Sequence, residues 1–314
     1  MKHLKVIFMG TPDFAVPCLE QLQQNCDVIA VITQPDRPRG RGQKMMPSPV
    51  KVFAQAHNLP ILQPEKIKTA EFQARLAELQ PDLIVVVAFG QLLSQTILDI
   101  PRLGCINVHA SLLPRYRGAA PIHWAIINGE TQSGVTTMFM DAGLDTGDMI
   151  LKTAVPISDA MTTEQLHDVL MSAGAKLLLE TVRQLAAGSA PRTKQTDEGT
   201  NYAPLLTKET GRIDWNKSAV AIHNLVRGLN SWPGAYTTLN GSNFKIWRTG
   251  VVGDNAAVSD AQAGEIVKIT NQGFYVATGD GLLEILELQA PSKKKMAAND
   301  YIRGHGLALP ARFE

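Results

Sequence analysis

The segment DLIVVVAF (82–89) is an uninterrupted apolar and mostly β-branched run, which is the pattern of a strand covered on both faces. Further strand-like runs lie on either side of it, separated by turn residues or by stretches with a helical period: LKVIFM (4–9), DVIAVIT (27–33), INVH (106–109) and VTTMFM (135–140). Strands and helices that alternate in this way form right-handed crossovers between parallel strands. We therefore predict an α/β fold whose mostly parallel open sheet has helices on both faces.

Two helix starts are marked by capping residues. Ser48 precedes Pro49, which puts a side-chain acceptor at the N-cap and a proline in the first turn. Thr162 and Gln165 form a capping box, and the apolar positions that follow repeat with a helical period until a glycine ends them. The sequence therefore predicts a helix that opens at Ser48 and a long helix over 163–187.

The composition changes after residue 188. Residues 189–206 are dominated by small, polar and turn-forming types, and we interpret them as a linker. Beyond them come short runs separated by Asn-Gly, Gly-Asp and similar hairpin signals: AYTTL (235–239), FKIWRTGVV (244–252), GEIVKIT (264–270), GFYVAT (273–278) and LLEILEL (282–288). We predict a first domain over 1–188 and, over 207–314, a small β-barrel or sandwich with one helix near 217–229.

Composition narrows the class of protein. The chain has 314 residues, of which 45% are hydrophobic, and this excludes a disordered polymer. It carries 30 basic and 29 acidic side chains, so any site for a polyanion must be local. Three cysteines without metal-site spacing argue against a disulfide framework and against structural zinc. Neither a signal peptide nor a membrane-spanning run is visible. We expect a soluble, cytoplasmic protein that needs neither a membrane nor a metal.

Asn107 and His109 stand two positions apart at the end of a predicted strand, so their side chains leave by the same face. In open α/β sheets that end of the strand faces the crevice where ligands bind. An amide can donate to a developing oxyanion, and an imidazole can move a proton near neutral pH. The residues therefore suit acyl-group chemistry, although a polar strand end satisfied by backbone groups would give the same pattern.

A tight loop with three carboxylates, Asp141, Asp145 and Asp148, follows the strand at 135–140. One of them could accept the ring N–H of His109 and so fix its tautomer. The alternative is an Asp-Gly turn in which the carboxylates bond only to nearby backbone groups. No histidine joins them at ligand spacing, so a metal site is the weaker interpretation.

A basic stretch, QPDRPRGRGQK (34–44), has a net charge of +3 and no hydrophobic period. Proline and glycine punctuate it, which indicates a surface loop, and it lacks the spacing of a nucleotide-phosphate loop. Its charge suits phosphate contacts to a nucleic acid, but a merely solvated loop is equally consistent with the pattern. The same two interpretations apply to Lys293, Lys294 and Lys295.

Several strings together show a family resemblance. They are FMGTPDFAVP (8–17), QPDRPRGRGQK (34–44), MPSPVK (46–51), AFGQLL (88–93), NVHASLLPRYRGAAPI (107–122), DAGLDTGD (141–148) and WPGAYT (232–237). On these motifs the chain resembles the methionyl-tRNA formyltransferases. The combination of Asn, His and Asp with SLLP is shared by folate-dependent formyltransferases generally. The basic loop and the appended β-domain resemble those of the tRNA enzymes in particular.

The resemblance implies a Rossmann-like formyltransferase domain followed by an OB-like barrel that binds tRNA. It implies transfer of the formyl group of 10-formyltetrahydrofolate to the amino group of methionyl-initiator tRNA, without a metal. Asn107, His109 and Asp145 would be the catalytic residues, and we expect a monomer. Four basic residues would contact tRNA: Arg37, Arg39, Arg41 and Lys44. The implied folate-site residues are Phe89, Gly90, Gln91, Leu92, Ser111, Leu112, Leu113, Pro114, Asp141, Ala142, Gly143 and Leu144.

The roles that the resemblance implies define a direct transfer. Asn107 and His109 would stabilise the charge on the formyl oxygen, with Asp145 aligning His109. Either His109 or a water held by Asp145 could return a proton to the leaving nitrogen. Two other functions remain open: a folate-dependent transferase or hydrolase that acts on a small amine, and a catalytically silent RNA-binding protein.

Overall fold

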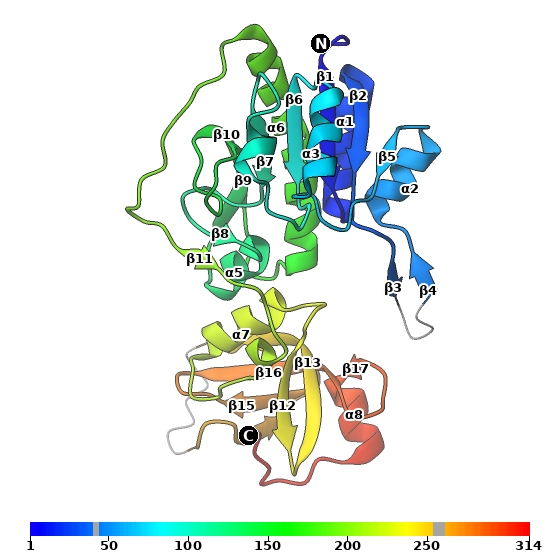
Figure 1. Ribbon diagram of the computed structural model, residues 1–314. Coiled ribbons are helices and arrows are strands. Elements are labelled where there is room, and N and C mark those ends of the chain that lie inside the picture. Colours follow the sequence, from blue (N-terminus) through cyan, green and yellow to red (C-terminus); the bar gives the residue numbers. More distant parts are fainter. Residues whose placement is uncertain (40–43, 254–260) are drawn as a thin grey trace. The chain divides into compact units, whose positions relative to one another are not determined.

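The computed structural model describes residues 1–39, 44–253 and 261–314, and these divide into two compact units (Figure 1). Unit 1 comprises Met1–Pro121, Ser133–Val155 and His167–Ala203. Unit 2 comprises Ile122–Gln132, Pro156–Leu166 and Pro204–Glu314. Most of the stretch 189–206, which we expected to be a linker, thus falls in unit 1, and unit 2 also includes two short segments that come before residue 167.

A seven-stranded sheet forms the centre of unit 1 within the described residues, in the order β10-β9-β7-β6-β1-β2-β5. Its strands are β1 (Lys5–Gly10), β2 (Asp27–Ile32), β5 (Ile61–Leu62), β6 (Leu83–Val87), β7 (Cys105–His109), β9 (Gln132–Phe139) and β10 (Met149–Pro156). The strands from β5 to β7 pair in parallel, and β9 pairs antiparallel with β7. The predicted mostly parallel sheet is confirmed.

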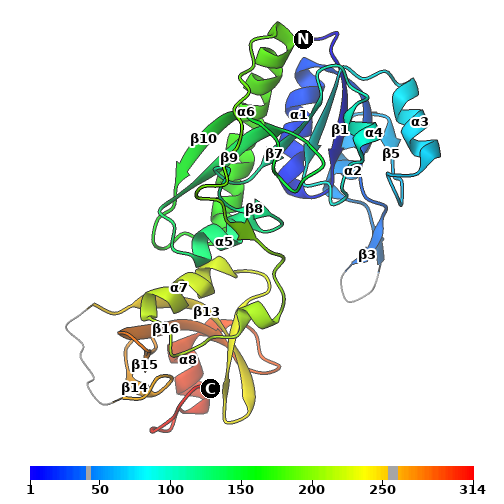
Figure 2. The same cartoon turned by 60° about the vertical axis from the view of Figure 1, so that its left-hand side comes forward.

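Helices cover both faces of this sheet, as the sequence predicts (Figure 2). They are η1 (Asp13–Ala15), α1 (Val16–Asn25), α2 (Pro49–Ala56), α3 (Ala70–Glu78), α4 (Gln95–Leu98) and α6 (Thr163–Ala187). On one face, buried Ile7 and Ile84 of the sheet share a core with Leu76 of α3 and Ile97 of α4. On the other face, Gly174 of α6 lies against Val108 and Val135, and Figure 2 shows α1 on this same side.

The predicted caps are confirmed. The Ser48 hydroxyl accepts from the Lys51 amide at 3.0 Å and opens α2. Thr162 and Gln165 bond reciprocally: the Thr162 amide donates to Gln165 Oε1 at 2.9 Å, and the Gln165 amide donates to Thr162 Oγ1 at 3.4 Å. The long helix α6 begins and ends where the capping box and the apolar period place it.

The strand order decides where a ligand can bind in unit 1. The chain passes from β1 outward to β2 and β5, and then returns to the other side of β1 to form β6 and β7. At such a reversal the crossovers leave in opposite directions and open a crevice at the carboxyl ends of the strands. Asn107 and His109 occupy the carboxyl end of β7, next to β6 on the returning side of this reversal.

Unit 2 is an antiparallel β structure with flanking helices. Its elements are α5 (Pro121–Ile127), η2 (Glu209–Gly211), α7 (Ala219–Gly228), β12 (Ala235–Leu239), β13 (Ser242–Val251), β14 (Ile266–Ile269), β15 (Phe274–Ala277), β16 (Leu282–Gln289), β17 (Met296–Ala297) and α8 (Ala298–His305). The strand order is β12-β13-β16-β15-β14, with β17 beside β16. The predicted helix near 217–229 is α7.

The C-terminal residues close this sheet into a barrel. Phe313 bridges Leu239 of β12, and Arg312 bridges Glu265 just before β14. The last residues therefore pair with both edge strands, so neither edge remains open there. Phe313 also stacks on Trp215 inside the barrel, with ring centroids 5.4 Å apart. Of the two predicted alternatives, barrel and sandwich, the structure shows the barrel.

Several elements escaped the sequence-based prediction: β5, β10, β17, α3, α4 and α8. Most are short, and β10 has no continuous apolar run because it alternates between buried and exposed positions. Among the residues that the structure describes, no helix is long and apolar enough to cross a membrane.

Candidate active site

Strand β7 holds two polar side chains at its end. Asn107 pairs with Val86 of β6 and Met138 of β9, so the strand is fixed from both sides. Asn107 is half-buried, whereas His109 is only 6% exposed. A buried polar ring requires defined hydrogen-bond partners, and these decide what chemistry the ring can perform.

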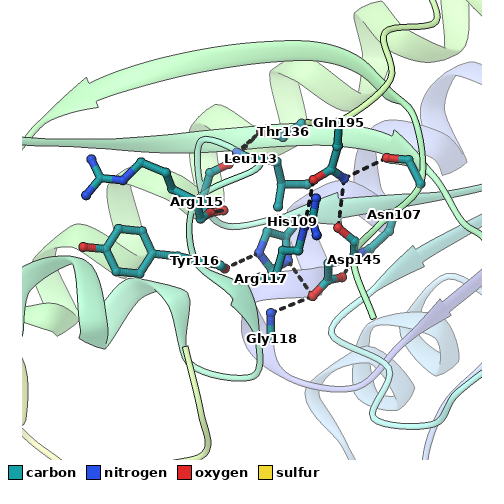
Figure 3. A network of polar contacts seen from close by, with 12 residues as sticks. Asn107, His109, Leu113, Arg115, Tyr116, Arg117, Gly118, Thr136, Asp145 and Gln195 are labelled. Atoms are coloured by element: carbon teal, nitrogen blue, oxygen red, sulfur yellow. Dashed lines mark hydrogen bonds and ion pairs between the residues drawn. The ribbon is translucent and has the colours of Figure 1, made fainter. Parts of the chain in front are cut away.

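The two nitrogens of His109 have different partners (Figure 3). Nε2 lies 2.8 Å from the carbonyl oxygen of Tyr116. A carbonyl oxygen can only accept, so Nε2 carries a proton and donates it. Nδ1 lies 3.6 Å from Asp145 Oδ2. The second nitrogen therefore faces a carboxylate and is the one available for proton transfer.

Asp145 joins three segments of unit 1. Its Oδ2 accepts from the Gly118 amide at 2.8 Å, and its Oδ1 accepts from Asn107 Nδ2 at 3.4 Å. Its backbone has a φ of 55°, in the left-handed region that residues other than glycine seldom adopt. The carboxylate expected beside His109 is thus Asp145, and Asn107, His109 and Asp145 do come together.

The other two carboxylates of the loop have local partners. Asp141 Oδ1 accepts from the Gly143 amide at 3.0 Å and from Thr146 Oγ1 at 2.7 Å, which makes a side-chain turn. Asp148 forms an ion pair with Arg192 at 2.7 Å. The turn interpretation of this loop is therefore correct for Asp141, and Asp145 is the carboxylate that faces His109, at 3.6 Å from Nδ1.

The SLLP segment forms a tight turn held by its own polar groups. Ser111 Oγ donates to the Arg115 carbonyl at 2.6 Å, and the Ser111 carbonyl accepts from Thr136 Oγ1 at 2.7 Å. The Leu113 amide donates to the same Thr136 oxygen at 3.1 Å. The Ser111 hydroxyl is therefore bonded within the protein. The turn also places the Tyr116 carbonyl beside His109.

The segment after β6 is fixed in a similar way. The buried Phe89 presents its carbonyl to Thr11 Oγ1 at 3.1 Å and to Gln34 Nε2 at 3.2 Å. The Gln91 side chain accepts from the Ile67 amide at 3.0 Å. Gln91 is therefore engaged within the fold through its amide oxygen.

The implied folate-site residues divide by exposure. Phe89, Ser111 and Leu113 are buried, while Leu112 and Pro114 are half-buried. Gly90, Leu92 and the loop over 141–144 are exposed. Two exposed leucines stand out among them, Leu92 at 60% and Leu144 at 50% exposure. The exposed group offers the largest side-chain surface to a bound molecule.

The basic stretch forms a hairpin of β3 (Arg37–Arg39) and β4 (Lys44–Met46) that projects from the sheet of unit 1 (Figure 1). Arg37 and Lys44 are exposed, and Arg41 lies outside the described residues. Asp36 at its base bonds to Lys51 Nζ at 2.7 Å, and this bond lowers the pKa of its carboxyl. The acidic residue of the stretch is therefore paired at the base of the hairpin.

Sequence reasoning missed three groups of the site: the Tyr116 carbonyl, the Gly118 amide and the Gln195 side chain. Gln195 Nε2 donates to the carbonyls of Asp145 at 2.8 Å and Gly147 at 2.7 Å. Backbone groups carry no signal in a single sequence, and Gln195 lies in a stretch whose composition indicates a linker. Among the described residues, no group of three or more His, Cys, Asp or Glu side chains could hold a metal ion.

Two family profiles match the chain. The profile described as formyl transferase matches residues 3–182, and the profile described as formyl transferase, C-terminal domain, matches residues 205–306. Curated relatives named methionyl-tRNA formyltransferase match nearly its whole length. The protein of Clostridioides difficile is 52% identical over 96% of this chain and 97% of its own. That of Geobacter metallireducens is 53% identical over 97% and 96%.

Solved structures are similar in fold. An N-formyltransferase from Helicobacter canadensis, in complex with folinic acid and dTDP-3-aminofucose, has a TM-score of 0.68 at 21% identity and covers 90% of this chain and 99% of its own. HypX from Aquifex aeolicus, in complex with tetrahydrofolic acid, has a TM-score of 0.60 at 16% identity. It covers 96% of this chain and 47% of its own.

Proposed function

The chain belongs to the formyl transferase family, and we propose that it transfers the formyl group of 10-formyltetrahydrofolate to the amino group of methionyl-initiator tRNA. The product, N-formylmethionyl-tRNA, serves translation initiation in the cytoplasm. The observation that carries the proposal is the meeting of Asn107, His109 and Asp145 at the end of β7, in a chain 52% identical to a methionyl-tRNA formyltransferase over 96% of its length. The protein acts as a monomer.

Asn107 supplies a hydrogen-bond donor to the formyl oxygen. Its present bond to Asp145 is long, at 3.4 Å, so the amide can exchange that partner for a substrate oxygen at small cost. As the methionyl amine attacks the formyl carbon, negative charge grows on this oxygen. A donor aimed at such charge typically contributes a factor of about 10²–10³ to the rate.

His109 works through Nδ1. Because Nε2 is bound to the Tyr116 carbonyl, proton transfer and donation to the substrate fall to the other nitrogen. Asp145 Oδ2 lies 3.6 Å from Nδ1, so its negative charge is placed to attract positive charge that develops on the ring during the reaction. The Nδ1 proton can then stabilise the formyl oxygen and pass to the leaving nitrogen, while the attacking amine, which loses a proton as the amide forms, returns one to Nδ1. Of the two open choices for the proton donor, we therefore propose His109.

The residues present fit a folate. When bound, 10-formyltetrahydrofolate supplies the formyl carbon that the amine attacks. Leu92 and Leu144 expose apolar side chains on which a flat ring can pack. The exposed loop over 141–144 offers backbone donors and acceptors for its polar edge. Of the implied set, Ser111 and Gln91 act by shaping the site, because their polar groups bond within the protein.

The β3–β4 hairpin holds the acceptor end of tRNA, with Arg37, Arg39, Arg41 and Lys44 as the contacts. Arg37 and Lys44 are exposed, and the only acidic residue of the stretch, Asp36, is paired with Lys51. Arg41→Leu should weaken tRNA use and flatten the dependence of log(kcat/KM) on log salt by about 0.7–0.9, one phosphate contact. Loss of folate affinity instead would place Arg41 in the donor site.

Unit 2 contributes most of the affinity for tRNA. On the outer face of β13, Trp247 has the ammonium groups of Lys245 and Lys295 at 5.4 and 5.8 Å from its ring. Trp232 is 61% exposed, and the Gly234 that follows it packs against Trp247. Aromatic rings flanked by cations suit stacked bases. Lys295 is also paired with Glu287 at 2.6 Å, and Lys245 donates to the Pro233 carbonyl at 3.2 Å. Catalysis and the contact to the acceptor end are thus assigned to unit 1, and most of the tRNA affinity to unit 2.

A substitution tests this surface without disturbing the barrel core. Base–aromatic stacking contributes about 1–3 kcal/mol, so Trp232→Ala should weaken tRNA binding about 5- to 150-fold. Val220→Ala removes an exposed apolar side chain from α7 of the same unit and should leave binding unchanged. Equal tRNA affinity in Trp232→Ala and wild type would remove this residue from the tRNA surface.

The choice of acceptor tests the proposed function as a whole. Purified protein is given 10-formyltetrahydrofolate with methionyl-initiator tRNA, and in parallel with methionine methyl ester, a small amine with the same reacting group. Remote contacts to tRNA raise kcat/KM only for the full acceptor, so a preference of roughly 10³-fold or more is expected. Equal efficiency with the ester would indicate a small-amine transferase, and binding of tRNA without formylation would indicate a silent RNA-binding protein.

A further inference from the structure

Gln195 links two parts of unit 1 that the reaction uses (Figure 3). Its Nε2 donates to the carbonyl of Asp145 at 2.8 Å and to that of Gly147 at 2.7 Å. Its Oε1 accepts from Nε of Arg117 at 3.0 Å, and Arg117 is only 4% exposed. One side chain thus uses both ends of its amide, with the donor end holding the loop that carries Asp145.

The partners fix the orientation of this amide. Turned by 180°, Oε1 would face two carbonyl oxygens and the NH₂ group would face a guanidinium. In that orientation no hydrogen bond forms, because an acceptor would face acceptors at the carbonyls and a donor would face a donor at Arg117. Gln195 is therefore specific in its chemistry: a carboxylate in its place keeps the contact to Arg117 and loses both donors.

The Asp145 backbone needs such support. Its φ of 55° is unfavourable for a side chain with a Cβ, and residues in such conformations persist only where the surroundings hold them. The Asp145 carboxylate is anchored by the Gly118 amide, and its carbonyl by Gln195. The two contacts together set the direction in which the carboxylate faces Nδ1 of His109.

The segment around Gln195 also holds the other partner of His109. We call residues 192–203 the strap. At its far end the Asn201 side chain accepts from the Tyr116 amide at 2.5 Å, and β11 (Tyr202–Ala203) pairs with β8 (Arg117–Gly118). At its near end Thr193 pairs with Met149 of β10. The Tyr116 carbonyl and Asp145, which face the two ring nitrogens, are thus both held by the strap.

We propose that the strap aligns the catalytic ring of His109 from both sides, and that Gln195 is the positioning residue for Asp145. The inference rests on the proposed function, because it assigns to this segment a part in formyl transfer. Gln195 acts through Asp145 rather than on a substrate. Its loss should therefore lower kcat and leave the KM values for the folate and for tRNA nearly unchanged.

Three variants separate the effect of the donors to the Asp145 loop from that of the contact to Arg117 and from any change in the strap. Gln195→Ala removes all three bonds, Gln195→Glu keeps only the acceptor for Arg117, and Lys194→Ala changes an exposed neighbour in the same strap. We expect kcat for formylation to fall about 10- to 100-fold in both Gln195 variants, as a small misplacement of a catalytic group does. Lys194→Ala should match wild type. Wild-type kcat in Gln195→Glu would overturn the proposal, because it would show that the donors to the loop are dispensable.

A double-mutant cycle asks whether Gln195 acts through Asp145. If it does, Gln195→Ala should cost little more in an Asp145→Asn background, because the group that it positions is already lost. Full additivity of the two losses in kcat would contradict the inference. So would a fall in the melting temperature large enough that unfolded protein accounts for the lost turnover.

A measurement without substrates keeps the inference separate from the proposed function. The ring ¹⁵N and ¹H resonances of His109, assigned by their absence in His109→Gln, report its two hydrogen-bond partners. They should move in Gln195→Ala and stay in place in Lys194→Ala. If wild type fails to formylate methionyl-tRNA while these shifts occur, the function is wrong and the positioning stands. Unmoved His109 resonances in Gln195→Ala would overturn the positioning.

Discussion

The carbonyl oxygen of Tyr116 lies 2.8 Å from Nε2 of His109. Because this contact occupies Nε2, proton transfer by the ring must use Nδ1. Tyr116 follows the tight turn that Ser111 and Thr136 hold together, so the carbonyl is a fixed acceptor. Nδ1 is left facing Asp145 at 3.6 Å. The arrangement orients the ring before any substrate binds, which is what electrostatic stabilisation of a developing charge requires.

The amide of Asn107 should be required as a donor rather than as a space-filling group. Asn107→Asp keeps the shape of the side chain, removes the N–H groups and sets a second carboxylate beside Asp145. We expect kcat to fall at least about 100-fold, the usual effect of losing an oxyanion donor. Steady-state formylation kinetics measure it, with folate binding as the control. Retention of more than a tenth of wild-type kcat would show that Asn107 is not a donor in the reaction.

The charge of Asp145 should matter separately from its hydrogen bonds. Asp145→Asn can still accept from the Gly118 amide but presents no negative charge to Nδ1. Turnover should drop about 10²–10⁴-fold, the range for a lost general acid–base function. Asp99→Asn makes the same change at an exposed residue after α4 and should be neutral. Equal activity of the two variants would contradict the assignment.

The strands and the catalytic pair could be predicted because they depend on local pattern. The run 82–89 is apolar throughout, and Asn107 and His109 end a strand with their side chains on one face. The role of Asp145 could only be stated as one of three carboxylates, since the choice depends on the Gly118 amide, which lies 27 residues away in the chain. The family resemblance supplied that choice.

The loop that carries Asp145 should not tolerate a side chain at Gly147. A Cβ there would lie 1.9 Å from the Phe139 carbonyl oxygen, a backbone atom that cannot rotate away. Gly147→Ala should therefore displace the loop, with a loss of stability of about 1–3 kcal/mol and a larger loss of turnover. Gly304→Ala, which lies in α8 and meets no atom within 4 Å, should leave the melting temperature unchanged or slightly raised. Equal melting temperatures for the two variants would disprove the close packing.

The contacts of the stretch 189–206 could not be inferred from composition. Its Ser, Thr, Gln and Asn side chains are typical of loops, yet several of them bond to the site through partners far apart in the chain. Gln195 reaches Asp145 across 50 residues, and Asn201 reaches Tyr116 across 85. The polar types that make a segment soluble also allow it to satisfy exposed backbone groups, so only the folded contacts distinguish a linker from a strap.

The three thiols should be unreactive in the folded protein. Burial raises the pKa of Cys18 and Cys105 to about 12 and that of Cys26 to about 11. In the unfolded chain the pKa of a cysteine thiol is about 8.5. Above that pH, unfolding therefore exposes thiols that ionise and release protons. The free energy of unfolding should therefore fall as pH rises above about 8.5. At pH 8, a disulfide reagent should modify the native thiols slowly, the half-buried Cys26 first, and all three rapidly in guanidinium.

Single-turnover formylation by His109→Ala tests the central claim most directly. The variant is mixed in excess with labelled formyl donor and methionyl-initiator tRNA, so that the rate reports transfer rather than release. Circular dichroism and folate binding verify that the fold and the donor site persist. The rate should be at least about 100-fold below wild type, because both the cation beside the formyl oxygen and the proton carrier are gone. A near-normal rate would contradict the assignment of the chemistry to Asn107, His109 and Asp145.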